Sequence, residues 1–197
     1  MMIAAVSDAQ VAFLPDEVSP VATLPTDSRS ANIIDIDADG LQDIFISNGP
    51  SVGANNLIYF NTGNGVFVPV PDNDINQDDN PSDGATFGDI DNDGDLDAFV
   101  TSWHGAENLF YLNNFGGTFT LQENEGITGI GTYSETASWG DYNADGLLDL
   151  YVTNSTDFDT ETDEVKRNLL FKNIGNGQLE PVTEGAPVED AFISRSV

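Results

Sequence analysis

The sequence contains no cysteine and a single histidine, His104, which excludes disulfide bonds, thiol chemistry and Cys/His metal sites. That histidine belongs to no nucleophile motif, and the chain has no glycine-rich phosphate-binding loop. Carboxylates are abundant enough to suggest paired-acid glycoside chemistry, but the regularly spaced ones fall in three repeated loops. We therefore expect this chain to have no catalytic residues and no enzymatic activity.

Basic residues are also scarce. The chain has 5 Lys and Arg residues against 34 Asp and Glu residues, a formal net charge of −29. Such a surface repels nucleic-acid phosphates and anionic membranes, so neither is an expected partner. No apolar run approaches the ~20 residues of a membrane-spanning helix, so we expect no membrane insertion. Residues 1–6 are too short and lack the basic residues of a secretory signal, so export would use an upstream signal or another route.

What the chain does contain is one nine-residue pattern in three copies: DIDADGLQD at 35–43, DIDNDGDLD at 89–97 and DYNADGLLD at 141–149. Each copy has carboxylate or amide side chains at positions 1, 3, 5 and 9. Calcium prefers about six to eight oxygen ligands, and alternating side chains supply them when the backbone curls around one point. The glycine at position 6 permits this curl because it enters left-handed conformations without a Cβ clash.

The spacing predicts five ligands in each loop. Position 7 is expected to contribute its main-chain carbonyl, which accounts for its varied side chains, and position 9 closes the shell. Asn143 brings an amide oxygen without charge, so the third loop is expected to bind more weakly. The predicted ligands are Asp35, Asp37, Asp39, Leu41 and Asp43; Asp89, Asp91, Asp93, Asp95 and Asp97; and Asp141, Asn143, Asp145, Leu147 and Asp149.

Two other interpretations begin from the same residues. An EF-hand needs a glutamate at position 12 and flanking helices, whereas position 12 here is Ile46, Val100 or Val152, within runs typical of strands. The plainer alternative is that Asp-Gly and Asn-Gly dipeptides only make hairpin turns. A turn needs one such dipeptide, so three copies with four donors in the same register favour calcium.

The loops recur at intervals of 54 and 52 residues, together with a second signature. This signature reads NLIYFNTGNGVF from Asn56, NLFYLNNFGGTF from Asn108 and NLLFKNIGNGQL from Asn168. It predicts a strand, a glycine-rich turn and another strand. Each repeat therefore reads as strand, calcium loop, strand, connection, strand, tight turn and strand. Four short antiparallel strands in this length make a β-propeller blade, so we predict an all-β fold.

These motifs resemble the FG-GAP/VCBS repeat family, whose best-known members form the calcium-binding propeller head of integrin α subunits. Residues 139–154 and the signature from Asn168 are especially similar to secreted bacterial repeats of the ASPIC/UnbV and cartilage-acidic-protein type. The resemblance covers about residues 30–197. It implies metal ligation by the side chains at positions 1, 3, 5 and 9 of each loop, and hence about three Ca²⁺ ions.

We predict that the whole chain is part of one propeller domain. The final SRSV is similar to the SRSA of Ser28–Ala31, so the last repeat is expected to stop where a further repeat begins. Propellers with this motif usually close about seven blades, so we expect a fragment of a larger ring; an arc closed by its own ends is the less favoured alternative. The predicted divisions are 1–30, a remnant of a preceding blade with strands in 9–15 and 19–25, and three repeats at 31–84, 85–136 and 137–197.

The resemblance implies a secreted or cell-surface module for adhesion or for protein or glycan binding, with calcium as a structural ion. Other repeats of the same parent protein are further expected partners. Extracellular calcium, at millimolar concentration, fills sites with dissociation constants of about 10⁻⁴–10⁻³ M. One alternative is the propeller part of an extracellular lyase or hydrolase whose catalytic residues lie outside this chain, since fold alone does not settle function. Another is a spacer without a specific ligand.

Overall fold

The computed structural model describes residues 18–49, 52–123, 127, 133–155 and 167–189. In this part of the chain twelve strands form three four-stranded antiparallel sheets, here called blades, and strands adjacent in sequence are adjacent in the sheet. Blade 1 contains β1 (Ser28–Ile34), β2 (Asp43–Asn48), β3 (Leu57–Asn61) and β4 (Phe67–Pro69). Blade 2 contains β5 (Ser82–Gly88), β6 (Asp97–Ser102), β7 (Leu109–Asn113) and β8 (Phe119–Leu121). Blade 3 contains β9 (Ser134–Gly140), β10 (Asp149–Asn154), β11 (Leu169–Gly175) and β12 (Gln178–Pro181).

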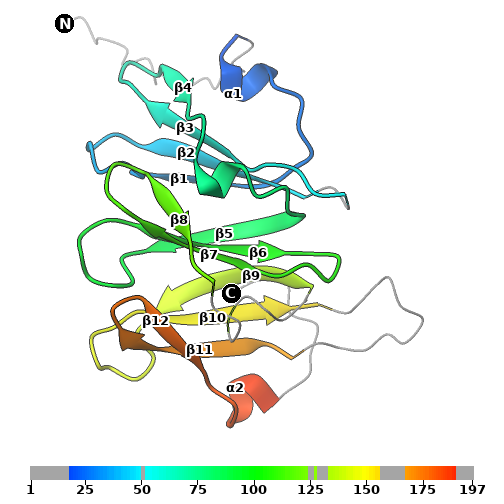
Figure 1. The fold of residues 1–197 in the computed structure, drawn as a ribbon, viewed down its shortest axis with the longest axis vertical. Helices are drawn as coiled ribbons and strands as arrows, with labels where there is room; N and C mark the ends of the chain where they lie inside the picture. The colour runs from blue at the N-terminus through cyan, green and yellow to red at the C-terminus, as the bar shows by residue number, and fades with distance from the viewer. Residues whose placement is uncertain (1–17, 50–51, 124–126, 128–132, 156–166, 190–197) are drawn as a thin grey trace, which may run out of the picture.

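The three blades follow one another along the long axis of the molecule, and among their first strands β1 packs against β5 and β5 against β9 (Figure 1). Each blade is a meander that leads from this inner strand outward to its fourth strand. The predicted all-β fold, with propeller blades of four antiparallel strands, is therefore confirmed. The repeat boundaries at residues 31, 85 and 137 fall inside the inner strands, and the division into domains remains a prediction.

The hydrophobic core lies between the blades. One buried cluster joins Phe45 and Ile58 of blade 1 to Val100 and Tyr111 of blade 2, and a second joins Phe99 of blade 2 to blade 3. Successive side chains of a strand point to opposite faces, so Val100 faces blade 1 while Phe99 faces blade 3. Strand β6 is consequently buried along its whole length, because it has a blade on each side.

Polar bonds also cross between the blades at a repeated position. The last residue of the third strand in blade 2, Asn113, donates its side-chain amide to the main-chain carbonyl of Ile36 in blade 1 at 3.1 Å. The equivalent Asn173 donates to the carbonyl of Ile90 in blade 2 at 2.8 Å. These two buried bonds link the third strands of blades 2 and 3 to the acidic loop of the preceding blade.

Helical structure in the described residues is limited to α1 (Pro20–Thr23), η1 (Asp74–Asn76) and α2 (Ala186–Glu189). The strand predicted within 19–25 is wrong: Pro20 stands at the start of a helical turn, where its fixed φ and missing N–H are tolerated. The strand predicted at 9–15 and the terminal SRSV lie outside the described residues. None of the helices in the described part of the chain is long and apolar enough to cross a membrane.

A half-buried carboxylate, that of Asp78, lies in the connection between blades 1 and 2. Asp78 accepts hydrogen bonds through Oδ2 from the side-chain amide of Asn56 at 2.6 Å and from the hydroxyl of Tyr111 at 3.3 Å. Its Oδ1 is buried and has no hydrogen-bond partner within the described structure. Burial raises the pKa of Asp78 from 3.8 to about 7, although the Tyr111 hydroxyl acts in the opposite direction. Below about pH 7 the folded protein therefore keeps Asp78 mainly protonated.

Between about pH 4 and pH 7 the unfolded chain ionises Asp78 while the folded chain keeps its proton, so this group destabilises the fold as the pH rises. We expect Asp78→Asn, which resembles the protonated acid, to abolish this dependence. At pH 8 the variant should be more stable than the wild type by on the order of 3 kcal/mol. Urea denaturation at pH 4.5 and pH 8 in the same calcium concentration measures the difference, with the exposed Asp79→Asn as control. Equal pH dependence of wild type and Asp78→Asn would contradict it.

Candidate metal centre

The three acidic loops join the first strand of each blade to the second, and they share one hydrogen-bond pattern. In the first loop, Asp35 accepts the amide of Asp39 at 3.1 Å and that of Gly40 at 2.9 Å. Asp37 also accepts the amide of Asp39, and Asp39 accepts the amide of Leu41. The equivalent bonds recur in the loops at 89–97 and 141–149. Each loop is thus a tight curl held by its own carboxylate and amide side chains.

Two residues of each loop adopt left-handed conformations. The glycines at position 6 have φ of +89°, +100° and +88°, which confirms the predicted reason for glycine there. The residue at position 4 is also left-handed, with φ of 60° at Ala38, 63° at Asn92 and 62° at Ala144. Alanine gives no sequence signal for this conformation, so the second left-handed residue was not predicted.

The curl brings carboxylates together in the first two loops. Oxygens of Asp35, Asp37 and Asp39 lie within 4.8 Å of one another, and so do oxygens of Asp89, Asp91 and Asp97. Each group can hold a metal ion. The acids of the third loop, all within the described residues, form no such group of three. The fifteen predicted ligands as a set remain a prediction.

The position 9 carboxylates have a second role, which sequence spacing did not reveal. Asp97 is 1% exposed and accepts the main-chain amides of Ile90 at 2.9 Å and Asn113 at 2.9 Å. It therefore joins the start of its loop to the third strand of its blade. The same pair of bonds is made in blade 1 by Asp43 and in blade 3 by Asp149. A carboxylate oxygen that accepts one such bond keeps a further lone pair.

Burial, and then the proximity of other carboxylates, raises the pKa values of several acids in the first two loops. Burial raises the pKa of Asp97 to about 7, and the neighbouring Asp91 and Asp95 raise it further. The pKa of Asp37 is raised by burial and by Asp43, and that of Asp91 by burial and by Asp93. A divalent cation at these loops would relieve both the repulsion and the cost of burying the charges.

Asp95, at position 7 of the second loop, differs from the leucines that occupy this position in the other loops. Its side chain is 3% exposed, and Oδ2 accepts the main-chain amide of Phe115 at 2.7 Å. Its Oδ1 is buried without a hydrogen-bond partner in the described structure. The prediction assigned only a main-chain carbonyl to this residue. An unpaired buried carboxylate oxygen beside Asp91 and Asp93 fits an oxygen-ligated hard cation.

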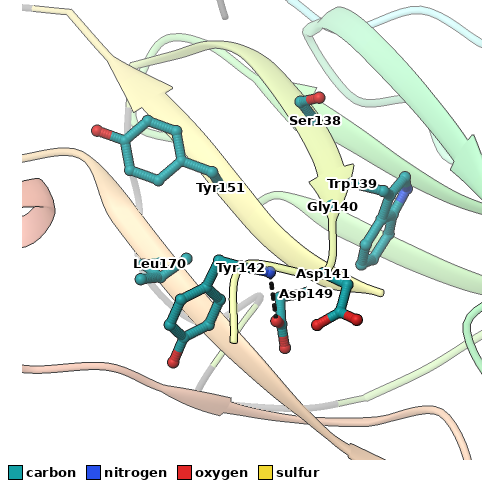
Figure 2. A pocket seen from close by; sticks show the side chains of 8 residues that line it. All are labelled: Ser138, Trp139, Gly140, Asp141, Tyr142, Asp149, Tyr151 and Leu170. Carbon is teal, nitrogen blue, oxygen red and sulfur yellow. Dashed lines mark hydrogen bonds between the residues drawn. The ribbon is translucent and has the colours of Figure 1, made fainter. Parts of the chain in front are cut away.

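A basic side chain from a neighbouring strand pairs with the third loop. The ammonium of Lys172, on β11, lies 3.3 Å from Oδ2 of Asp145. The side-chain amide of Asn143 donates to Asp149 at 3.3 Å. Figure 2 shows part of this loop, where the main-chain amide of Tyr142 donates to Asp149.

A pocket of about 250 Å³ lies on the outer face of blade 3, with Tyr142, Tyr151 and Leu170 on its walls (Figure 2). Its position corresponds to a face that is covered in the other blades. Ile90 and Phe99, the counterparts of Tyr142 and Tyr151 in blade 2, are fully buried against blade 3. Tyr142 is 54% exposed. The pocket is therefore a part of the blade-packing surface that no described blade covers.

A second pocket, of about 310 Å³, lies at the opposite ends of the inner strands from the acidic loops. Equivalent residues of the three blades line it: Arg29, Asp83 and Glu135. Burial and the Glu135 carboxylate raise the pKa of Asp83 to about 6, although Arg29 opposes this shift. The guanidinium of Arg29 lies 5.4 Å from the ring centroid of Trp103, which also contacts the ring of Tyr133.

The fold and the loops define a β-propeller repeat protein with an Asp-rich loop between the first two strands of each blade. The model of the FG-GAP-like repeat family matches residues 35–100 and 97–152, more than half of the chain. The chain belongs to this family, as its motifs predicted.

A similar solved structure is that of an Agrocybe aegerita lectin with specific recognition of non-reducing terminal N-acetylglucosamine. The two chains are 22% identical, and the TM-score is 0.51 over 85% of this chain and 40% of the lectin. This likeness supports the propeller fold, and the chain spans less than half of the lectin's length. No curated protein matches the chain in sequence.

The position 9 carboxylates are expected to stabilise the blades even without metal. Asp43→Ala leaves two main-chain amides without their acceptor, so it should cost about 2–4 kcal/mol of unfolding free energy in chelator. The matched control is Asp39→Ala, which removes an exposed carboxylate from the same loop and should cost less than about 1 kcal/mol under these conditions. Urea denaturation with excess EDTA measures both. Equal losses would contradict the assigned role of Asp43.

Proposed function

We propose that this chain is a calcium-stabilised propeller module of a secreted or cell-surface protein, and that it binds glycans or other proteins. The observation that carries the calcium part is the pair of three-carboxylate groups, at equivalent loops of consecutive FG-GAP-like blades. Carboxylate oxygens without a described basic partner suit a hard cation such as Ca²⁺ better than a soft one. Family membership supports an extracellular location, where calcium is abundant.

We assign the proposed ligands of each ion by their position in the loop. Each loop would hold its ion through the side chains at positions 1, 3, 5 and 9, with position 7 completing the shell. These side chains are Asp35, Asp37, Asp39 and Asp43 in the first loop and Asp89, Asp91, Asp93 and Asp97 in the second. The third loop would supply its own five residues, giving about three ions in all. Bound calcium would neutralise the converging carboxylates and fix the turn between the first two strands. Its role is structural, and the chain itself would not be an enzyme.

Removal of calcium is expected to destabilise the protein. A site that is occupied at about 100 times its dissociation constant adds roughly 2.7 kcal/mol to stability, so two such sites should raise the melting temperature by about 10 °C or more. Calorimetric melting in calcium and in EDTA tests this. The double variant Asp39→Ala/Asp93→Ala should lose most of the difference. An unchanged melting temperature after chelation would contradict calcium binding.

The most suitable ligand surface is the end of the blades opposite the acidic loops. The pocket there combines carboxylates, Asp83 and Glu135, with the neighbouring Trp103 ring. Carboxylates accept hydrogen bonds from sugar hydroxyls, and an aromatic ring packs against the apolar face of a sugar. The similar lectin, which recognises terminal N-acetylglucosamine, supports the choice of a glycan.

Glycan binding is expected to depend on Trp103. On an array that includes terminal N-acetylglucosamine, the wild type should bind at least one glycan class, and Trp103→Ala should reduce that binding about tenfold or more. Phe115→Ala, a change of an exposed aromatic residue in the β7–β8 turn beside the second acidic loop, is the control and should bind normally. Uniformly negative arrays would favour a protein ligand or a spacer.

Other repeats of the same parent protein are the proposed partners of the outer face of blade 3. The equivalent faces of blades 1 and 2 are each covered by the next blade, which supports this assignment. The proposed propeller domain comprises a remnant of a preceding blade at 1–30 and three repeats at 31–84, 85–136 and 137–197. The pocket shown in Figure 2 would then be filled by a neighbouring blade rather than by a ligand.

A further inference from the structure

Lys172 occupies a position that holds an apolar side chain in the other two repeats. Its counterparts in the repeated NL signature are Phe60 in blade 1 and Leu112 in blade 2. Phe60 packs against Gly117, and Leu112 packs against Gly177, so each lies against a turn of the following blade. In blade 3 the lysine instead directs its ammonium to Asp145 in the acidic loop of its own blade.

The third loop is therefore provided with protein donors that the other loops lack. Lys172 pairs with Asp145 at 3.3 Å, and the amide of Asn143 donates to Asp149 at 3.3 Å. In the first two loops, position 3 is an aspartate, which has no amide to donate. No described ion pair links a basic side chain to either of those loops.

The number of carboxylates also separates the third loop from the first two. Positions 1, 3, 5, 7 and 9 carry four carboxylates in the first loop, five in the second and three in the third, where Lys172 adds one positive charge. Fewer carboxylates lower the affinity of an oxygen site for calcium. An ammonium at the same oxygens lowers it further, because the ion must displace it or bind beside it. Both differences lower the affinity of the third loop for calcium.

We propose that Lys172 is the built-in counter-ion of the third loop, and that it sets the affinity of this loop for calcium well below that of the other two. This inference rests on the proposed function, in which all three loops bind calcium. At low calcium the ammonium holds the third loop in its curled conformation. At high calcium the ion replaces it at Asp145. The module therefore has two loops that depend on calcium and one that is stable without it.

Lys172→Leu, which introduces the residue found at this position in blade 2, tests the proposal, with Lys172→Arg as the charge-preserving control. Calcium titration by calorimetry should show two tight sites in the wild type and a third at least about tenfold weaker. Lys172→Leu should tighten the third site about tenfold, while Lys172→Arg should leave it weak. Tight sites in the first two loops with an unchanged third site in Lys172→Leu would overturn the role of Lys172. Absence of calcium binding to any loop would instead overturn the proposed function.

Amide hydrogen exchange in EDTA provides a second readout, which does not require calcium to bind. The amides of 141–149 should be better protected than those of 35–43 and 89–97 in the wild type, and Lys172→Leu should remove that difference. If Lys172→Leu does not fold, Asn143→Asp removes the amide donor while Lys172 is retained. It should tighten the third site by restoring a carboxylate, yet leave it weaker than the first two. Equal protection of the three loops in wild-type protein without calcium would contradict the proposal.

Discussion

One buried carboxylate in each blade joins the acidic loop to the third strand, and hydrogen bonds connect these carboxylates from blade to blade. Asp97 accepts the amides of Ile90 and Asn113, and the side chain of Asn113 reaches back to the carbonyl of Ile36 in the preceding blade. Ile36 in turn donates its amide to Asp43. The same steps lead from Asp97 onward through Ile90 and Asn173 to Asp149. Hydrogen bonds to charged acceptors are stronger than neutral ones, and burial raises the cost of losing them. The acidic loop and the packing of successive blades are thus parts of one network.

The sequence predicts the repeat better than it predicts the contacts between repeats. Regular spacing of aspartate and glycine and the alternation of apolar residues suffice to indicate four strands, a curled loop and a propeller blade, because these features are local. The role of Asn113 could not be predicted, since a signature asparagine before a turn gives no sign of a bond to another blade. Asp95 was assigned only through its main chain, because its burial depends on the β7–β8 turn. The left-handed backbone conformation of Ala38 could not be predicted either, because alanine has no preference for that conformation. The apolar residues around Pro20–Thr23 favour a strand in the sequence, but Pro20 lies at the first position of a short helix, where proline is tolerated.

The two end faces of the described blades differ in chemistry. Ile33, on the first strand of blade 1, is 67% exposed, whereas its counterparts Phe87 and Trp139 pack against the core between blades. On the opposite end, Tyr142 and Tyr151 replace the isoleucine and phenylalanine that are buried in blade 2. The Tyr151 hydroxyl donates to the carbonyl of Pro187 next to blade 3, so this face already satisfies one polar group within its own blade. A face with tyrosines tolerates water better than one with isoleucine and phenylalanine, because the hydroxyl keeps a hydrogen-bond partner in either setting.

The chain has a formal charge of −29, and several carboxylates occur in the acidic loop of every repeat. Their mutual repulsion can be relieved in two different ways. Converging carboxylates repel one another, and the loop's own amides satisfy their hydrogen bonds without neutralising their charge. In the first two loops only an external cation or protons can supply that charge, which agrees with the raised pKa values of Asp37, Asp91 and Asp97. In the third loop Lys172 supplies it from within the chain. A carboxylate paired with a basic side chain of the same chain carries a fixed entropy cost at folding, whereas one that binds an ion from solution gains stability in proportion to the logarithm of the ion concentration. Under the proposed function, the first two loops would make the stability of the fold respond to calcium, and the third would make part of it independent of calcium.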